Sequence, residues 1–158
     1  CAGTALLLGG YTGCTAVRPG DAAQLKNRLQ DTNRLSEAEP LMRRALAIDE
    51  KSFGPEHPNV AIRLNNLASL LQDTNLGEAE PPYRRALTID EKNFGTEHPK
   101  VALRLNNLAQ FLTDISRLTE AEPLMRRALA IDEKSFGPNH PDVARDLNNL
   151  SSLLRDTN

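Results

Sequence analysis

The chain has 158 residues, of which 39% are hydrophobic and 25% are charged, with a formal net charge of −2 at pH 7. This composition indicates one folded domain, and it lacks the basic excess expected of a dedicated nucleic-acid binder. Apolar runs stay well below the roughly 18 residues of a membrane span. The two cysteines, Cys1 and Cys14, lie before the repeated part of the sequence, so neither a disulfide nor a zinc site is expected to hold the fold.

Residues 1–20 share no pattern with the rest of the chain. The stretch that ends at Cys14 faintly resembles the end of a bacterial lipoprotein signal, in which a small residue precedes a lipidated cysteine. The charged n-region is missing, the apolar run is short, and Tyr11 stands where leucine is usual. We therefore prefer an irregular leader on a cytoplasmic protein. The alternative is a protein that is exported or lipid-anchored through an N-terminal cysteine.

From Asp21 to Asn158 the sequence consists of two alternating themes. Successive copies are 42 residues apart, and this period is shortened to 41 in the middle of the chain. Self-similarity at such a period predicts a solenoid, in which each repeat buries its apolar face against its neighbours. We therefore expect an all-α fold, an α-solenoid of stacked antiparallel helix pairs, after a non-repeat segment over residues 1–20. Residues 21–158 would hold a partial first repeat, two further full repeats and the lone first helix of a fourth.

The start of the array predicts two separate helices. Asp21, with Gln24 three residues later, has the pattern of a capping box at the start of a short helix. Ser36 and Glu39 repeat that pattern before a longer helix, whose alanine, leucine and methionine residues recur at helical spacing. Gly54 predicts the end of this helix, because glycine readily adopts the left-handed conformation that follows a last turn.

The other theme predicts a helix that begins just after a histidine. His57 stands at the N-cap position and Pro58 at the first helical position, where its fixed φ suits a helix start. The apolar residues of this helix recur at helical spacing and form one face: Val60, Leu64, Leu67, Ala68 and Leu71. Later copies keep the pattern, so the same helix is expected again in each repeat.

The middle copy of the longer helix departs from its siblings. Gly77 replaces the capping serine, and two prolines follow one another at Pro81 and Pro82. Proline lacks the backbone N–H that a helix needs beyond its first turn. We therefore expect this helix to begin late or to kink, and to open more easily than the others.

Large and small residues follow one another over two helices in the order of the tetratricopeptide signature: Leu64, Leu67, Ala68 and Leu71, then Ala79, Tyr83 and Ala86. The 42-residue period and the pattern LNNLA…EAEPL.RRAL.I.EK.FG..HP more specifically resemble the long tetratricopeptide repeats of kinesin light chains. They also resemble those of bacterial proteins that join such arrays to NTPase domains. The resemblance covers residues 21–158. It implies a right-handed superhelix that binds a protein or peptide in its concave face and has no catalytic activity of its own.

In the register of that family, one side of each histidine-capped helix faces the concave groove. Each of these helices carries an asparagine pair, and an asparagine amide can both donate to and accept from a peptide backbone. Our hypothesis is that the first asparagine faces the groove and the second serves the helix interface. Alternatively, the pair only fixes the stacking. The expected peptide-binding residues are Ile62, Asn65, Ser69, Gln72, Leu103, Asn106, Gln110, Arg145, Asn148 and Arg155.

The same inner line becomes more basic toward the C-terminus. Arg145 stands where earlier copies have Ile62 and Leu103, and Arg155 stands where the first copy has Gln72. A guanidinium recognises carboxylates well, so this change predicts an acidic partner segment.

The pattern of histidines argues against a metal or catalytic site. One histidine occurs per repeat, at His57, His98 and His140, and equivalent positions of a solenoid lie a full repeat apart. They cannot converge on one ion within about 2 Å, and no phosphate-binding loop of the G-x-x-x-x-G-K-[ST] type is present. We therefore expect no metal, no cofactor and no enzymatic activity, and we assign the histidines to helix capping.

The function expected from the sequence is a protein-interaction scaffold that binds an extended, acidic segment in its groove. One alternative is a structural spacer that forms a homo-oligomer through the open C-terminal helix, whose Leu147, Leu150 and Leu154 would have no following helix to cover them. A second alternative is the sensor or regulatory region of a larger multidomain signalling NTPase.

Overall fold

The computed structural model describes the backbone of residues 19–156 and the side chains of residues 34–155. The interpretations of residues 1–18 as a leader or a lipid-anchored segment lie outside the described residues. Between residues 19 and 156 the chain forms six α-helices and no strand, so the all-α prediction is confirmed. The helices are α1 (Pro19–Phe53), α2 (Pro58–Thr74), α3 (Leu76–Phe94), α4 (Pro99–Asp114), α5 (Leu118–Phe136) and α6 (Pro141–Asp156).

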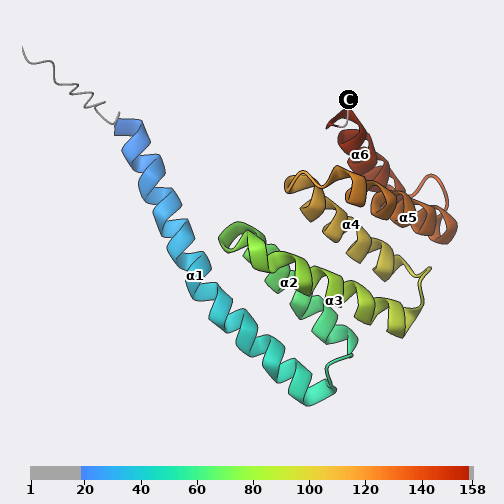
Figure 1. The fold of residues 1–158 in the computed structure, drawn as a ribbon, viewed down its shortest axis with the longest axis horizontal. Helices are drawn as coiled ribbons and strands as arrows, with labels where there is room; N and C mark the ends of the chain where they lie inside the picture. The colour runs from blue at the N-terminus through green and yellow to red at the C-terminus, as the bar shows by residue number, and fades with distance from the viewer. Residues whose placement is uncertain (1–18, 157–158) are drawn as a thin grey trace, which may run out of the picture.

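The helices form hairpins that stack side by side. Figure 1 shows α2 with α3 as one hairpin and α4 with α5 as the next, with α1 and α6 packed at the two ends. α2 also touches α4, and α4 touches α6, whereas α3 and α5 make no such close backbone contact. The even-numbered helices therefore lie closer together than the odd-numbered ones, and they form the inner, concave side of the solenoid.

Histidine caps each even-numbered helix, as predicted. The Nδ1 atoms of His57, His98 and His140 accept hydrogen bonds from the backbone N–H two residues later, at 3.2, 3.1 and 3.2 Å. Each imidazole also stacks on the phenylalanine that ends the preceding helix, with ring centroids 4.4–4.9 Å apart. A side-chain cap contributes about 1 kcal/mol to helix stability, so these histidines fix both the helix start and the loop before it.

Glycine follows the end of each odd-numbered helix. Gly54, Gly95 and Gly137 have φ angles of 93°, 86° and 84°, a region that residues with a Cβ rarely adopt. A Cβ built at these positions meets nothing within 4 Å. Glycine is therefore required here by the backbone conformation and not by lack of space, which confirms the predicted helix ends.

The prediction of two separate N-terminal helices was wrong. α1 is one continuous helix of 35 residues, so Ser36 lies inside it and does not begin a new helix. Lys26 and Arg28 stand where the next copy has the buried Ala68 and Leu70. The first part of α1 therefore lacks the apolar face with which α2 packs on α3, and little free energy favours a turn back onto the second part.

The prediction for α3 was a late start or a kink, and the late start was wrong. α3 and α5 both have 19 residues and begin at equivalent leucines, Leu76 and Leu118. Pro81 and Pro82 lie inside α3, where they remove donors from the second turn. The turn is held instead by packing, because Tyr83 directly after the prolines is only 5% exposed. Burial of an aromatic side chain offsets the two backbone hydrogen bonds, about 1 kcal/mol each, that the prolines cannot make.

The core is a continuous stripe of small and large apolar side chains between the helices. Its leucines on α4, Leu105, Leu108 and Leu112, are each 0% exposed. Eight alanines of the described side chains are equally inaccessible: Ala61, Ala68, Ala79, Ala86, Ala102, Ala109, Ala121 and Ala128. The apolar face predicted for the histidine-capped helices is therefore buried on α2 and α4. Replacing one of these leucines by alanine would cost about 2–5 kcal/mol. None of the helices in the described part of the chain is long and apolar enough to cross a membrane.

We predict that the start of α3 exchanges its amide hydrogens faster than the start of α5. α3 has two consecutive prolines where α5 has only Pro123, so its second turn has one backbone donor fewer. A hydrogen bond contributes about 1 kcal/mol, which corresponds to roughly five- to tenfold faster exchange. Native-state hydrogen exchange by NMR over Gly77–Tyr83 and Leu118–Met125 measures the difference. Equal protection of the two segments would refute the prediction.

Candidate functional site

Two equivalent hollows open on the concave side, each where the end of an odd-numbered helix meets the starts of two even-numbered helices. The middle hollow has a volume of about 260 Å³ and is lined by Pro58, Ile62, Asp90, Phe94, Lys100, Leu103 and Arg104. The C-terminal hollow has a volume of about 210 Å³ and is lined by Pro99, Lys100, Leu103, Asp132, Phe136, Asp142 and Arg145. Most of these positions correspond one repeat apart, so the two hollows can be compared directly.

The middle hollow has an apolar floor and one exposed cation. Ile62 on α2 and Leu103 on α4 are 48% and 42% exposed, although they are large hydrophobic residues. The Lys100 Nζ atom lies 4.2 Å from the centroid of the Phe94 ring, a cation–π contact. The hollow therefore offers an apolar surface of two side chains next to a positive charge.

A buried ion pair forms the wall of the middle hollow. Arg104 Nε donates to Asp90 Oδ2 at 2.8 Å, and the two side chains are 9% and 1% exposed. The pair joins α3 to α4, and the loss of one partner would leave a buried charge at a cost of about 3–5 kcal/mol. The equivalent pair one repeat earlier, Arg63 with Asp49, also has a distance of 2.8 Å but is more exposed.

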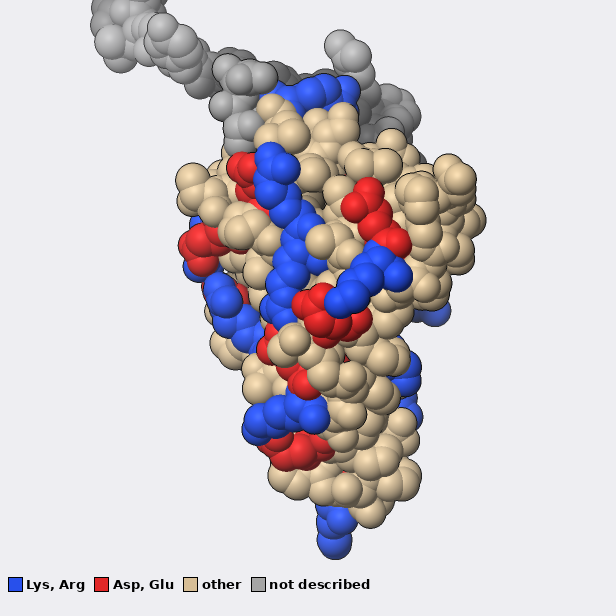
Figure 2. All heavy atoms as spheres, turned by 90° about the vertical axis from the view of Figure 1, so that its right-hand side faces the viewer, with Lys and Arg blue, Asp and Glu red and all other residues tan. Residues whose placement is uncertain are grey.

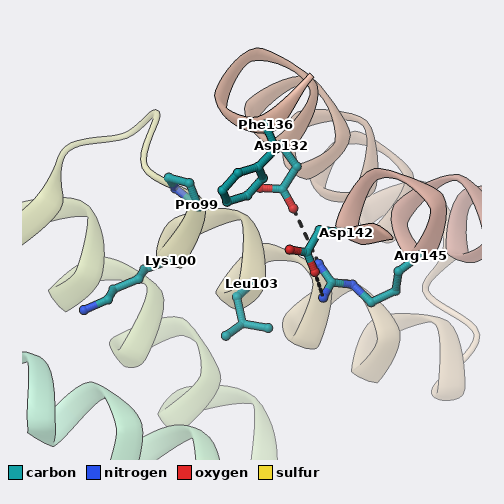
Figure 3. Close-up of a pocket in the computed structure, with 7 residues that line it drawn as sticks. All are labelled: Pro99, Lys100, Leu103, Asp132, Phe136, Asp142 and Arg145. Carbon is teal, nitrogen blue, oxygen red and sulfur yellow. Dashed lines mark hydrogen bonds and ion pairs between the residues drawn. The ribbon is translucent and has the colours of Figure 1, made fainter. Parts of the chain in front are cut away.

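In the C-terminal hollow, one guanidinium faces three carboxylates. Arg145 lies 2.6 Å from Asp142, 3.3 Å from Asp146 and 3.5 Å from Asp132. Figure 3 shows Asp132 between the Phe136 ring and Arg145. The prediction that Arg145 makes this end of the groove basic was wrong, because its charge is more than balanced by the carboxylates around it.

The excess of carboxylates around Arg145 arises because residue types are exchanged along α6. Asp146 occupies the position of Arg104, so the buried ion pair of the middle repeat is replaced by two facing carboxylates, Asp132 and Asp146. Asp132 Oδ1 and Asp146 Oδ2 are buried and have no hydrogen-bond partner. Burial raises the pKa of Asp132 to about 6, with a further contribution from the charge of Asp146 and against the opposing effect of Arg145.

The asparagine pairs join neighbouring even-numbered helices. Asn107 Nδ2 donates to Asn65 Oδ1 at 2.8 Å, and Asn106 Nδ2 donates to Asp146 Oδ1 at 2.7 Å. Asn106 is only 5% exposed, so the hypothesis that the first asparagine of each pair faces the groove was wrong at this position. The reason is Asp146, which draws the Asn106 amide into the interface between α4 and α6. Asn65 is half-buried and Asn148 is exposed.

The other predicted site residues lie along the C-terminal halves of the even-numbered helices. Gln72 is half-buried and donates to Asp114 at 2.5 Å, and Gln110 is exposed and donates to the other oxygen of Asp114 at 2.8 Å. Ser69 lines a separate hollow beside α1, and Arg155 lines another on α6. The structure therefore brings only Ile62, Leu103 and Arg145 to the two concave hollows. The predicted set omitted Phe94, Lys100, Phe136 and Asp142, which appear in the sequence only as parts of the repeated loop.

The odd-numbered helices carry an ordered set of ion pairs on their outer side. Arg43, Arg84 and Arg126 each pair with the glutamate four residues earlier, at 2.7–2.8 Å. Arg85 and Arg127 reach back to the preceding loop, where they donate to the carbonyl oxygens of Pro55 and Thr96 at 3.2 and 3.0 Å. Figure 2 shows basic and acidic side chains interleaved on the face it presents. Such exposed, balanced pairs stabilise only weakly, and they do not form a single-sign binding patch.

Among the described residues, no group of three or more histidine, cysteine, aspartate or glutamate side chains is placed to hold a metal ion. The three histidines cap three different helices.

The raised pKa of Asp132 predicts that replacing Asp146 by asparagine stabilises the protein more at pH 7 than at pH 4. A carboxyl whose folded-state pKa lies above its ordinary value binds protons more tightly in the folded state, so it reduces stability as pH rises from about 4 through 6. Asparagine removes one of the facing charges and keeps an acceptor for Asn106. We expect a relative gain of about 1–2 kcal/mol at pH 7.

Urea unfolding of the wild type and the Asp146→Asn variant between pH 4 and pH 7 measures this gain. Glu97→Gln serves as the control, because Glu97 is an exposed carboxylate whose ion pair with Lys134 lies outside this cluster. Other groups change the stability with pH in the opposite direction, such as Glu120, whose pKa is lowered by a hydrogen bond from Arg117. Their contributions are the same in both proteins, so they cancel when the variant is compared with the wild type. A stability difference that stays constant with pH would contradict the prediction.

The tetratricopeptide repeat family model matches three overlapping stretches, residues 22–92, 69–132 and 100–158. Among solved structures, the nearly identical TPR-like repeats of a Podosopora anserina protein described as a kinesin light chain give a TM-score of 0.71. The identity is 24%, over 85% of this chain and 64% of that chain, and a single-residue variant of that protein gives the same values. BtubC (BKLC) from P. vanneervenii gives a TM-score of 0.71 at 27% identity, over 79% of this chain and 50% of that chain.

The aligned part thus spans about half to two thirds of the length of these solved structures. No curated protein matches the chain. The three overlapping matches cover nearly all of the repeated region, and the helix hairpins have the arrangement of the solved TPR structures. The chain belongs to the tetratricopeptide repeat family.

Proposed function

We propose that the chain is a non-catalytic interaction scaffold that binds an extended segment of a partner protein along its concave side. The observation that carries this proposal is the pair of exposed apolar side chains, Ile62 and Leu103, on the floor of the middle hollow. Half-exposed residues of this size gain free energy when a partner covers them, at about 25 cal/mol per Å² of apolar area. Protein–protein interaction is also the usual role of tetratricopeptide repeats, and kinesin light chain-like proteins have the same fold.

Amide side chains further along the even-numbered helices suit an extended backbone. The exposed Asn148 and Gln110 and the half-buried Asn65 lie on successive even-numbered helices. Amide side chains can pair with both the N–H and the C=O of a peptide. Asn106 is bonded to Asp146 between α4 and α6. It therefore stabilises the helices under these residues and is not proposed to contact the partner segment directly.

Lys100 is the cation that would recognise an acidic residue of the partner. Its side chain is exposed at the middle hollow, whereas Arg104 is paired with Asp90 and Arg145 is surrounded by carboxylates. A carboxylate of the partner would therefore be placed at the middle hollow, next to the apolar side chain that covers Ile62 and Leu103.

We predict that replacing Ile62 and Leu103 by serine weakens binding of the partner segment by roughly thirtyfold. Each substitution removes about 1 kcal/mol of apolar burial, because each side chain is about half exposed before binding. The partner is obtained by affinity capture from the source cell, its binding segment is mapped with overlapping peptides, and affinities are measured by fluorescence anisotropy.

Leu41→Ser provides the matched control. Leu41 is 67% exposed but lines neither concave hollow, so its loss should leave affinity unchanged. If the control and the double variant lose affinity equally, or if neither does, the binding site lies elsewhere. Circular dichroism of both proteins verifies that the helices remain folded.

A second candidate function is self-association through α6. Leu147 and Leu154 are 48% and 37% exposed, and they line a hollow of about 400 Å³ with Leu150, Ser151 and Arg155. Covering such a face with a second copy would create a homo-oligomer, consistent with the structural-spacer alternative. Because the solved structures are longer than the part matched here, a role as the sensor region of a larger signalling NTPase stays a further proposal.

Light scattering over a range of protein concentrations tests the second candidate. If α6 mediates self-association, the average mass should rise with concentration, and Leu147→Glu should abolish the rise by placing a charge in the apolar contact. A monomer at all concentrations would exclude this mode. It would leave the groove proposal unaffected, because Leu147 lies outside both concave hollows.

A further inference from the structure

The two concave hollows are formed by equivalent positions but differ in charge. In the middle hollow one carboxylate, Asp90, is accompanied by two cations, Lys100 and Arg104. Because Arg104 neutralises Asp90 across 2.8 Å, the remaining charge is the single positive charge of Lys100. This hollow therefore favours an anionic group.

The charge is reversed in the C-terminal hollow. The positions of Asp90, Lys100 and Arg104 are taken by the three aspartates that surround Arg145. Three carboxylates and one guanidinium leave a net charge of −2 when all are ionised. Lys100 also lines this hollow, but its Nζ atom is held over the Phe94 ring, and Figure 3 shows its side chain extending away from Asp132 and Asp142.

An aromatic ring stands beside these carboxylates. Phe136 is 44% exposed and corresponds to Phe94, the ring that carries the Lys100 ammonium in the middle hollow. The residue that corresponds to Lys100 is Asp142. In the middle hollow the ring position is occupied by the chain's own Lys100, whereas in the C-terminal hollow the equivalent ring has the carboxylate of Asp142 beside it. An aromatic face next to a carboxylate is a favourable environment for an ammonium or guanidinium group.

A buried oxygen supports the same conclusion independently of the charge count. Asp132 lines the C-terminal hollow and is 2% exposed, yet its Oδ1 atom has no hydrogen-bond partner. Buried carboxylate oxygens normally accept a hydrogen bond, and each one left without a donor costs about 1–3 kcal/mol. Arg145 reaches only the other oxygen, at 3.5 Å. The Asp132 carboxylate therefore lacks the close guanidinium partner that Arg104 provides to Asp90 in the middle hollow.

We propose that the C-terminal hollow binds a cationic side chain, the guanidinium of an arginine or the ammonium of a lysine, against Asp142 and the Phe136 ring. The inference rests on the proposed function, since it identifies the partner segment as one with a basic residue at this hollow. The same segment would place its acidic or apolar residue at the middle hollow, beside Lys100. The two hollows then fix the direction in which the segment lies, because a reversed segment would bring like charges together.

The test uses the full chain and a small probe, N-acetyl-arginine amide, with N-acetyl-citrulline amide as a neutral compound of nearly the same shape. NMR titration at low salt follows the Phe136 ring and Arg145 Nε resonances. The arginine probe should give saturable shifts, and the citrulline probe should bind about tenfold more weakly, because a hydrogen bond to a charged group is worth more than one between neutral groups.

Two variants exchange the charges of the hollows. Asp142→Lys introduces the residue that the preceding repeat already carries at this position, and it should weaken arginine-probe binding by about tenfold. Lys100→Asp changes the middle hollow and should not weaken it. Asp142→Asn serves if the lysine variant does not fold, and it should also reduce binding. Equal binding of the two probes, or binding insensitive to Asp142, would overturn the proposal.

The outcome is separable from that of the groove proposal. If the arginine probe does not bind but serine at Ile62 and Leu103 still weakens capture of the partner, the cationic site is wrong and the groove stands. If the probe binds at Asp142 but those serine substitutions have no effect on partner binding, the cationic site stands and the groove proposal fails.

Discussion

Close approach of helices at buried alanines is the constraint on which the rest of the structure depends. Ala68, Ala86, Ala109 and Ala128 are completely inaccessible, and a larger side chain at these positions would force the helices apart. With the helices fixed at this distance, the leucines fill the gaps and the opposite side of each even-numbered helix faces the concave surface. Ile62 and Leu103 are therefore exposed because the core geometry places them on the inner side, beyond the reach of the next helix.

Polar contacts then fix how one repeat is oriented on the next. The buried pair of Arg104 with Asp90 joins α3 to α4, and the hydrogen bond of Asn107 to Asn65 joins α4 to α2. Apolar packing tolerates small rotations, whereas a buried charge or amide without its partner carries a large cost. These contacts contribute more to orientation than to net stability. They also bring the loop residues Phe94 and Lys100 to the edge of the groove in a defined position.

Much of the fold could be predicted from the sequence, because the repeat period, the apolar spacing and the histidine and glycine helix ends are local signals. What could not be predicted depends on packing between segments. α1 is continuous because its first part lacks an apolar face that could pack back onto its second part. α3 begins at the regular position because Tyr83 is buried, despite the two prolines before it. The site was predicted only in part for the same reason. Arg145 lines the C-terminal hollow, but its charge could not be judged without knowing that three aspartates surround it.

The last helix, α6, shows how a solenoid can change what it binds without changing its shape. Relative to α4, the arginine of α6 stands one position earlier and an aspartate takes its place, yet the C-terminal hollow has nearly the volume of the middle one. The change costs stability, because two carboxylates now face each other in the core and the pKa of Asp132 rises to about 6. Each repeat contacts only its neighbours, so this cost stays local and the alanine stacking of the other repeats is unaffected. A strained, negatively charged hollow of this kind is stabilised by any cation that reaches it, which links the instability of the buried pair directly to binding at the surface.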